Sequence, residues 1–229
     1  MTRRPIVAID GPAGSGKSST AKAVAERVGF VHLDSGAVYR AVTLVALETI
    51  GGAPGDWDEA ALVAAAPRRA IAVRLAGGFA VLVGARVVEA ELRSAAVTRE
   101  VSRVAAMPAV RKYVNALLRE AARDGGVVMD GRDIGTVVFP DAEVKVFMIA
   151  DPDERAKRRL AEQGRRATDD TIRAEAGHLQ ARDRRDSARI VAPLAQAEDA
   201  VLLDTTRLTF EEQVRRVVAL VQRATRAQP

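Results

Sequence analysis

The chain reads Gly11-Pro12-Ala13-Gly14-Ser15-Gly16-Lys17-Ser18 shortly after its start. This stretch fits the phosphate-loop pattern G-x-x-x-x-G-K-[ST] at every fixed position. A short apolar run, Ile6–Ile9, precedes it, and apolar residues at helical spacing follow it as far as Gly29. A strand, a glycine-rich turn and a helix in this order predict a loop whose backbone N–H groups converge on the phosphates of a nucleotide.

The side chains of this loop indicate the kind of nucleotide. Lys17 is expected to bridge the β- and γ-phosphates, and the Ser18 hydroxyl to ligate Mg²⁺. A dinucleotide-binding turn is disfavoured, because Ser19 stands where G-x-G-x-x-G requires its third glycine. A guanine-specific N-K-x-D loop is not found, since the one asparagine, Asn115, is followed by Ala116. We therefore expect ATP, bound by Gly11, Pro12, Ala13, Gly14, Ser15, Gly16, Lys17, Ser18 and Ser19.

Hydrophobic periodicity along the chain predicts an α/β fold. Short apolar runs alternate with helical patterns, which is typical of a parallel sheet with crossover helices. Between a glycine-rich break at 51–55 and residue 124, three strand-like runs separated by glycines such as Gly77-Gly78 predict a small antiparallel meander. The runs expected to form the five-stranded parallel core are Ile6–Ile9, Phe30–Leu33, Val127–Met129, Val144–Ile149 and Val201–Leu203.

Composition limits the class of protein. Hydrophobic residues are 48% and charged residues 28%, as in folded globular domains, and the absence of cysteine excludes disulfides and thiolate metal sites. The longest uncharged stretch, Leu75–Ala85, is too short to cross a bilayer, and Ile6–Ile9 is too short for a signal peptide. We expect a cytoplasmic protein without a membrane partner. His32 and His178 lack metal-ligand spacing and are interpreted as structural.

Basic residues are concentrated in one segment. Arg155–Arg189 contains eleven Arg or Lys against six Asp or Glu, an excess equal to the net charge of +5. A solvated helix face with i,i+4 ion pairs is the plainer interpretation. The functional one is a mobile arginine-rich lid, which excludes water and neutralises a phosphoryl-transfer transition state. A nucleic-acid-stimulated ATPase is an alternative from another class, although 3% aromatic content provides no stacking platform.

Two polar turns follow predicted strands, where they are expected to face the phosphate loop. The first is Asp34-Ser35-Gly36, with Arg40 one helical turn beyond as a candidate anion ligand. In the second, Asp130 ends a buried strand and is expected to support Mg²⁺. Arg132 is a candidate for phosphate and Asp133 for an amine donor. The structural alternatives are a helix cap in the first turn and a simple polar turn in the second.

Five stretches together resemble one family, namely Ile9–Ser18, Leu33–Arg40, Asp130–Pro140, Glu154–Arg159 and Arg182–Pro193. They are similar to the motifs of the bacterial cytidylate kinases, within the nucleoside monophosphate kinases, and the resemblance covers essentially the whole chain. It implies Mg²⁺-dependent transfer of the γ-phosphoryl group of ATP to CMP or dCMP, which gives ADP and CDP or dCDP.

The resemblance also implies roles for individual residues. The acceptor phosphate would be held by Arg40, Arg132 and Arg189. The cytosine edge would be read by Ser102, Arg111 and Asp133, with Ser35 close by. The sugar would be contacted by Arg182 and Asp186. The lid over ATP would include Arg155, Arg158 and Arg159. The groups expected to act on the transferring phosphoryl group are Lys17, Arg132, Arg158, Arg159 and Arg189.

We therefore expect a single phosphate-loop kinase domain, in the three-layer α/β fold of such kinases, over residues 1–229. Its core would comprise 1–55 and 125–229, with a helical lid at about 151–192 and an inserted acceptor-binding subdomain at 56–124. The partners would be small-molecule nucleotides, with no nucleic acid, and the protein would be a monomer. A uridylate-type or other small-molecule kinase is the alternative within the same class.

Overall fold

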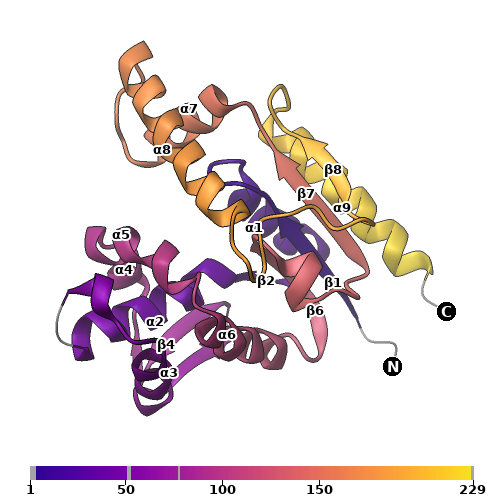
Figure 1. Ribbon diagram of the computed structural model, residues 1–229. Helices are drawn as coiled ribbons and strands as arrows, with labels where there is room; N and C mark the ends of the chain where they lie inside the picture. The colour runs from indigo at the N-terminus through magenta and orange to yellow at the C-terminus, as the bar shows by residue number, and fades with distance from the viewer. Residues whose placement is uncertain (1–3, 51–52, 77, 228–229) are drawn as a thin grey trace. The chain divides into compact units, whose positions relative to one another are not determined.

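The structure is a computed structural model that describes residues 4–50, 53–76 and 78–227 (Figure 1). The glycines Gly51, Gly52 and Gly77, which belong to two of the predicted breaks, lie outside the described residues. Contacts divide the chain into two compact units. The first unit combines Met1–His32 with Gly125–Pro229, and the second is Leu33–Asp124.

The first unit is built on a five-stranded sheet in the order β2-β6-β1-β7-β8. The central strand β1 pairs in parallel with β6 on one side and β7 on the other, and β7 pairs in parallel with β8. The predicted five-stranded parallel core is confirmed. The strands are β1 (Arg4–Asp10), β2 (Val31–Asp34), β6 (Gly125–Gly131), β7 (Val144–Ile149) and β8 (Val201–Asp204).

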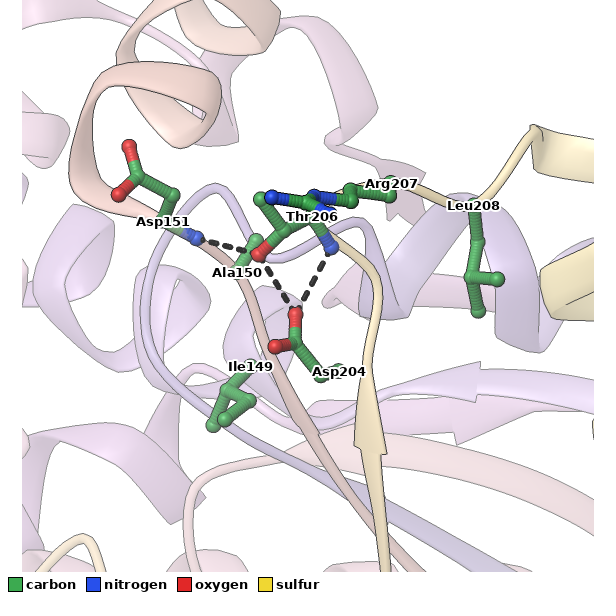
Figure 2. Close-up of a pocket in the computed structure, with 7 residues that line it drawn as sticks. All are labelled: Ile149, Ala150, Asp151, Asp204, Thr206, Arg207 and Leu208. Carbon is green, nitrogen blue, oxygen red and sulfur yellow. Dashed lines mark hydrogen bonds between the residues drawn. The ribbon is translucent and has the colours of Figure 1, made fainter.

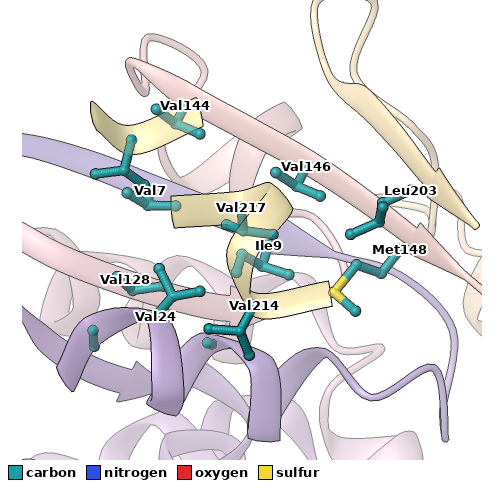
Figure 3. Close-up of a cluster of buried hydrophobic side chains, with 13 residues drawn as sticks. Val7, Ile9, Val24, Val128, Val144, Val146, Met148, Leu203, Val214 and Val217 are labelled. Carbon is teal, nitrogen blue, oxygen red and sulfur yellow. The ribbon is translucent and has the colours of Figure 1, made fainter. Parts of the chain in front are cut away.

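Helices α1 (Lys17–Val28) and α9 (Phe210–Ala227) pack against one face of this sheet. Alternate strand residues such as Val7 and Ile9 point to this face, because successive side chains of a strand point to opposite sides. They meet Val24 of α1 and Val214 of α9 in a fully buried cluster (Figure 3). Each such side chain stabilises the fold by roughly 1.5–3 kcal/mol relative to exposure, so this core holds the loops at the sheet's carboxyl edge in place.

Two further helices of the first unit, α7 (Pro152–Glu162) and α8 (Asp169–Ser187), lie side by side in Figure 1. Asp151 caps α7 by accepting the backbone N–H of Asp153, with Pro152 in the first turn. Thr168 and Thr171 form a reciprocal capping box at the start of α8. Both helices fall within the segment at 151–192 that the sequence assigns to a lid. A short π-helical turn, η2 (Ile134–Val138), follows β6.

The second unit contains the predicted antiparallel meander, which is confirmed as the three-stranded sheet β3 (Ile71–Arg74), β4 (Ala80–Val83) and β5 (Arg86–Val87). The predicted break in the helical region near Met107 is also confirmed. Helix α5 ends at Val104, and α6 starts at Pro108. The remaining elements are α2 (Ser35–Thr49), η1 (Pro54–Asp56), α3 (Glu59–Arg68), α4 (Glu89–Leu92), α5 (Ala95–Val104) and α6 (Pro108–Ala121).

This unit includes the predicted insert at 56–124 together with α2, which packs on α3, α5 and β4. That the insert binds the acceptor stays a prediction. Within the part of the chain that the structure describes, every helix is too short or too polar to span a bilayer.

Candidate active site

The phosphate loop connects β1 to α1 at the carboxyl edge of the central strand. Several of its positions require glycine, and two of them show why. Gly16 has a left-handed backbone (φ 87°) at the start of α1. A Cβ on Gly11 would lie 2.1 Å from the carbonyl oxygen of Met148 in β7, which is far inside any normal contact. The loop therefore follows β7 closely and presents the amino end of α1, which is the electropositive end of a helix.

Lys17 lies across this loop. Its side chain is buried, and Nζ donates a hydrogen bond to the carbonyl oxygen of Pro12 at 3.1 Å. The Lys17 charge also acts on the carboxylates of Asp10 and Asp130. The ammonium group is thus held over the loop at the point where nucleotide phosphates bind in such loops.

Asp130, near the end of β6, is 2% exposed and contacts two side chains. Ser18 Oγ donates to its Oδ2 at 2.5 Å, and His32 Nε2 lies 2.7 Å from its Oδ1. Burial alone would raise the pKa of Asp130. The hydrogen bonds and charges of His32, Lys17 and Ser18 outweigh burial, so the pKa is lowered below its ordinary value of 3.8 and the group is ionised at neutral pH.

The Ser18 hydroxyl, in the phosphate loop, and the Asp130 carboxylate are both hard oxygen donors and lie side by side. Mg²⁺ is usually bound by one or two such groups together with substrate phosphates and water. The residues present therefore fit this ion. His32, which the sequence indicated only as structural, orients the carboxylate of this pair.

Asp10 is a second buried carboxylate, and the sequence did not single it out. It ends β1 directly before Gly11, and it accepts the backbone N–H groups of Ile134 at 2.8 Å and Gly135 at 2.7 Å. Burial raises the pKa of Asp10 to about 6, although these two hydrogen bonds lower it. The nearby charge of Asp133 raises this pKa further, and that of Lys17 lowers it.

Three residues that the sequence assigns to the acceptor meet in the first unit. Asp186, near the end of α8, is 1% exposed and accepts Nε of Arg132 at 3.0 Å. Nη2 of Arg189 donates to its other oxygen. One buried carboxylate thus holds two guanidinium groups, and the cluster keeps an excess positive charge that suits a bound anion.

The arginines that the sequence assigns to a lid have different surroundings. Arg155 donates to Asp183 at 2.5 Å and to the carbonyl oxygen of Ala13 at 3.1 Å, while Asp183 accepts the backbone N–H of Ala13 at 3.2 Å. Ala13 also packs its methyl group into the small core between α7 and α8. The phosphate loop therefore contacts α7 and α8 through both polar and apolar groups.

Arg158 is also held against the phosphate loop, whereas Arg159 is at the surface. Arg158 donates to the Thr205 hydroxyl at 2.9 Å, to the Thr205 carbonyl at 2.8 Å and to the Ser15 carbonyl at 3.4 Å. Arg159 forms an ion pair with Glu162, three residues further along α7, at 3.0 Å. Sequence spacing gave no sign of this difference.

Four of the predicted residues lie in the second unit. Arg40 of α2 donates to the Leu92 carbonyl at 3.1 Å and to Thr98 Oγ1 at 2.9 Å. Arg111 of α6 is buried, with its guanidinium 5.3 Å from the centre of the Tyr39 ring. Ser35 is buried in the first turn of α2, and Ser102 is half-buried on α5.

A cavity of about 680 Å³ lies at the carboxyl ends of β7 and β8 in the first unit (Figure 2). Asp204 accepts both the N–H and the hydroxyl of Thr206, at 2.9 and 2.6 Å, and the Thr206 hydroxyl accepts the N–H of Asp151 at 2.9 Å. None of these residues was predicted from the sequence. The lining residues are Ile149, Ala150, Asp151, Asp204, Thr206, Arg207 and Leu208.

Comparisons with known proteins agree with the resemblance noted in the sequence. The family model described as cytidylate kinase matches residues 7–223. The cytidylate kinase of Limosilactobacillus fermentum is 44% identical over 226 residues, which cover 97% of this chain and 98% of that protein. That of Salinibacter ruber is 46% identical over 226 residues, covering 95% and 96%. A crystal structure of an uncharacterized protein from Eubacterium ventriosum has a TM-score of 0.51 at 11% identity, covering 96% of this chain and 99% of that one, and supports the fold alone.

Proposed function

The chain belongs to the cytidylate kinase family, and we propose that it transfers the γ-phosphoryl group of ATP to CMP or dCMP with Mg²⁺ at the donor phosphates. The observation that carries this proposal is the pairing of Asp130 with Ser18 of a complete phosphate loop, in a chain whose residues 7–223 match the family. The products are ADP and the corresponding cytidine diphosphate.

ATP occupies the loop from Gly11 to Ser19, with Lys17 on its β- and γ-phosphates. The cavity at the ends of β7 and β8 accepts the adenine of the donor. Its position supports this assignment, since Thr205, between two residues that line the cavity, donates through its hydroxyl to the Ser15 carbonyl of the phosphate loop at 3.2 Å. Mixed apolar and polar linings of this kind suit a planar base.

Ser18 and Asp130 are the residues that would hold Mg²⁺. When bound, the ion supplies positive charge that offsets the charge developing on the transferring group. His32 keeps the Asp130 carboxylate in orientation, as residues behind a metal ligand commonly do.

Arg132 and Arg189 hold the acceptor phosphate, a role that the resemblance also implies for Arg40. Asp133 reads the cytosine, a role that the resemblance also implies for Ser102 and Arg111. A carboxylate accepts from the N4 amine of cytosine, while a guanidinium donates to its N3 and O2 acceptors. Uracil lacks the amine and would offer the buried Asp133 carboxylate no hydrogen bond in its place, at a cost of about 1–3 kcal/mol. Arg182 and Asp186 contact the sugar.

The transfer needs no protein nucleophile. An oxygen of the acceptor phosphate forms the new bond to the γ-phosphorus, and the bond from that phosphorus to the β–γ bridging oxygen breaks in line with it. Alignment and charge neutralisation by Lys17, Arg132 and Arg189 provide the rate. Arg158 and Arg159 contribute once they leave their present partners, Thr205 and Glu162.

An acceptor panel tests this function. ADP formation is measured with ATP and CMP, dCMP, UMP or AMP, and we expect the two cytidine monophosphates to be preferred. Comparable turnover of UMP or AMP would indicate another kinase of the same class. ATP turnover that is equally fast without an acceptor, or stimulated by DNA or RNA, would indicate an ATPase. Lys17→Ala should abolish turnover with every acceptor, whereas Lys22→Ala on the exposed face of α1 should not.

A further inference from the structure

Asp10 makes two hydrogen bonds that reach across the chain. Its Oδ1 accepts the N–H of Ile134 and its Oδ2 accepts the N–H of Gly135, over separations of 124 and 125 residues. These are the first two residues of the η2 turn, whose free N–H groups point toward its amino end. A buried carboxylate from the central strand thus takes the place of a capping side chain.

The turn that Asp10 holds carries two residues assigned to the acceptor. Asp133 immediately precedes Ile134, and its carbonyl accepts the N–H groups of Val137 and Val138. Arg132 lies one residue earlier. Any shift of the Ile134–Gly135 peptide would therefore move the Asp133 carboxylate and the Arg132 guanidinium.

Gly135 of this turn is packed closely against neighbouring side chains. A Cβ on Gly135 would lie 3.2 Å from Cδ of Lys145 and 3.4 Å from Oδ2 of Asp10. The ends of β1 and β6 are also in register, with Asp10 opposite Gly131. The turn lies against the ends of β1 and β6. Asp10 accepts the first two backbone N–H groups of this turn.

We propose that Asp10 is a positioning residue for acceptor selection, because it fixes the backbone on which Asp133 and Arg132 are presented. This rests on the proposed function, which assigns Asp133 to the cytosine edge. Asp10 needs no contact with either nucleotide for this role. Its position directly before Gly11 joins the acceptor-reading turn to the start of the phosphate loop.

Both carboxylate oxygens of Asp10 accept hydrogen bonds, so asparagine is an informative replacement. Asp10→Asn keeps the size of the side chain but places an amide NH₂ against one of the two backbone N–H groups. One hydrogen bond is lost and the other can remain. Asp10→Ala removes both. The matched control is Glu212→Gln, because Glu212 also accepts a backbone N–H at the start of a helix, from Thr209 at 2.8 Å, at a half-buried position of α9.

The experiment compares Asp10→Asn, Asp10→Ala, Asp133→Ala and Glu212→Gln in the full chain. For each we measure KM for ATP, KM for CMP, and the ratio of kcat/KM for CMP over UMP. We expect Asp10→Asn to raise the CMP KM and lower the CMP preference by about tenfold, with the ATP KM changed less than about twofold. Amide hydrogen exchange over 131–138 in the nucleotide-free protein should accelerate in Asp10→Asn and stay unchanged in Glu212→Gln.

Three results would overturn the proposal, each in a different way. An equal rise of the ATP and CMP KM values in Asp10→Asn would show that Asp10 stabilises the fold in general and has no specific role in acceptor selection. In a second case, Asp133→Ala loses the preference for CMP, whereas Asp10→Asn keeps it and shows unchanged amide hydrogen exchange. This would overturn the positioning role of Asp10 and leave the base-reading role of Asp133 intact. An Asp133→Ala variant that still prefers CMP would overturn the base-reading role in the proposed function, and the selectivity role of Asp10 with it.

Discussion

Asp183 accepts the backbone N–H of Ala13 at 3.2 Å, although one residue lies on α8 and the other in the phosphate loop, 170 positions apart. Arg155 completes the contact by donating to both Asp183 and the Ala13 carbonyl. Both polar groups of residue 13, its N–H and its C=O, are therefore held by side chains of α7 and α8.

Asp183→Ala should weaken the binding of ATP more than that of CMP. The variant leaves the buried Arg155 guanidinium without its carboxylate, which we expect to cost about 1–3 kcal/mol of unfolding free energy. The ATP KM should rise several-fold, because the loop loses its support. Urea unfolding and KM values for both substrates check this. Asp170→Ala, which breaks an exposed pair with Arg173 on the same helix, should change neither. Unaltered ATP affinity in Asp183→Ala would show that the contact does not shape the loop.

Asp130→Asn should raise the Mg²⁺ concentration needed for half-maximal activity by about tenfold or more, since the ion would lose an ionised ligand. Ser18→Ala should act in the same direction. His32→Ala should have a smaller effect, because it only releases the Asp130 carboxylate from one hydrogen bond. The measurement is a Mg²⁺ titration at fixed ATP, with the exposed Asp141→Asn as control. An equal response of Asp130→Asn and Asp141→Asn would argue against the assignment.

The stability contributed by Asp10 should depend on pH with a definite sign. Burial raises its pKa from 3.8 to about 6 in the folded state, with Asp133 and Lys17 acting in opposite directions. Folding therefore favours the protonated form, so this contribution is fully present below pH 3.8 and is lost as pH rises through about 6. The unfolding free energy of the wild type relative to Asp10→Asn should fall by on the order of 3 kcal/mol between about pH 4 and pH 7. Urea unfolding across this range checks it, and a rise instead of a fall would contradict the raised pKa.

Arg189→Lys should raise the CMP KM by about tenfold while the ATP KM stays close to that of the wild type. Lysine keeps the charge but loses the planar fork that can contact Asp186 and an anion together. Arg185→Lys makes the same change on an exposed position of α8 and should leave both constants unchanged. Steady-state kinetics with each substrate varied in turn distinguish the two variants. Matching behaviour of the two variants would speak against a role for Arg189 at the acceptor.

The elements of the fold could be predicted closely, since each strand and helix has a local pattern. The run Val144–Ile149 alternates toward the buried cluster, and it is β7 with those bounds. The helix break at Pro108 follows from the missing N–H of proline, and α6 starts there. The glycines of the phosphate loop were recognisable because the backbone needs them at fixed spacing.

The contacts within the site were less predictable. Asp10, Asp183 and His32 act through partners that lie about a hundred positions or more away in the sequence, and no local pattern signals such a pairing. Arg158 and Arg159 are neighbours with the same chemistry. Their different positions around helix α7 bring Arg158 to Thr205 and Arg159 to Glu162.

The sharing of Asp186 by Arg132 and Arg189 has an evolutionary consequence. If a lineage lost this acid alone, both guanidinium groups would lose the carboxylate that they share, and a change at any one of the three sites would be penalised until the others changed as well. These positions should therefore be inherited as a group, and double-mutant cycles among them should depart strongly from additivity.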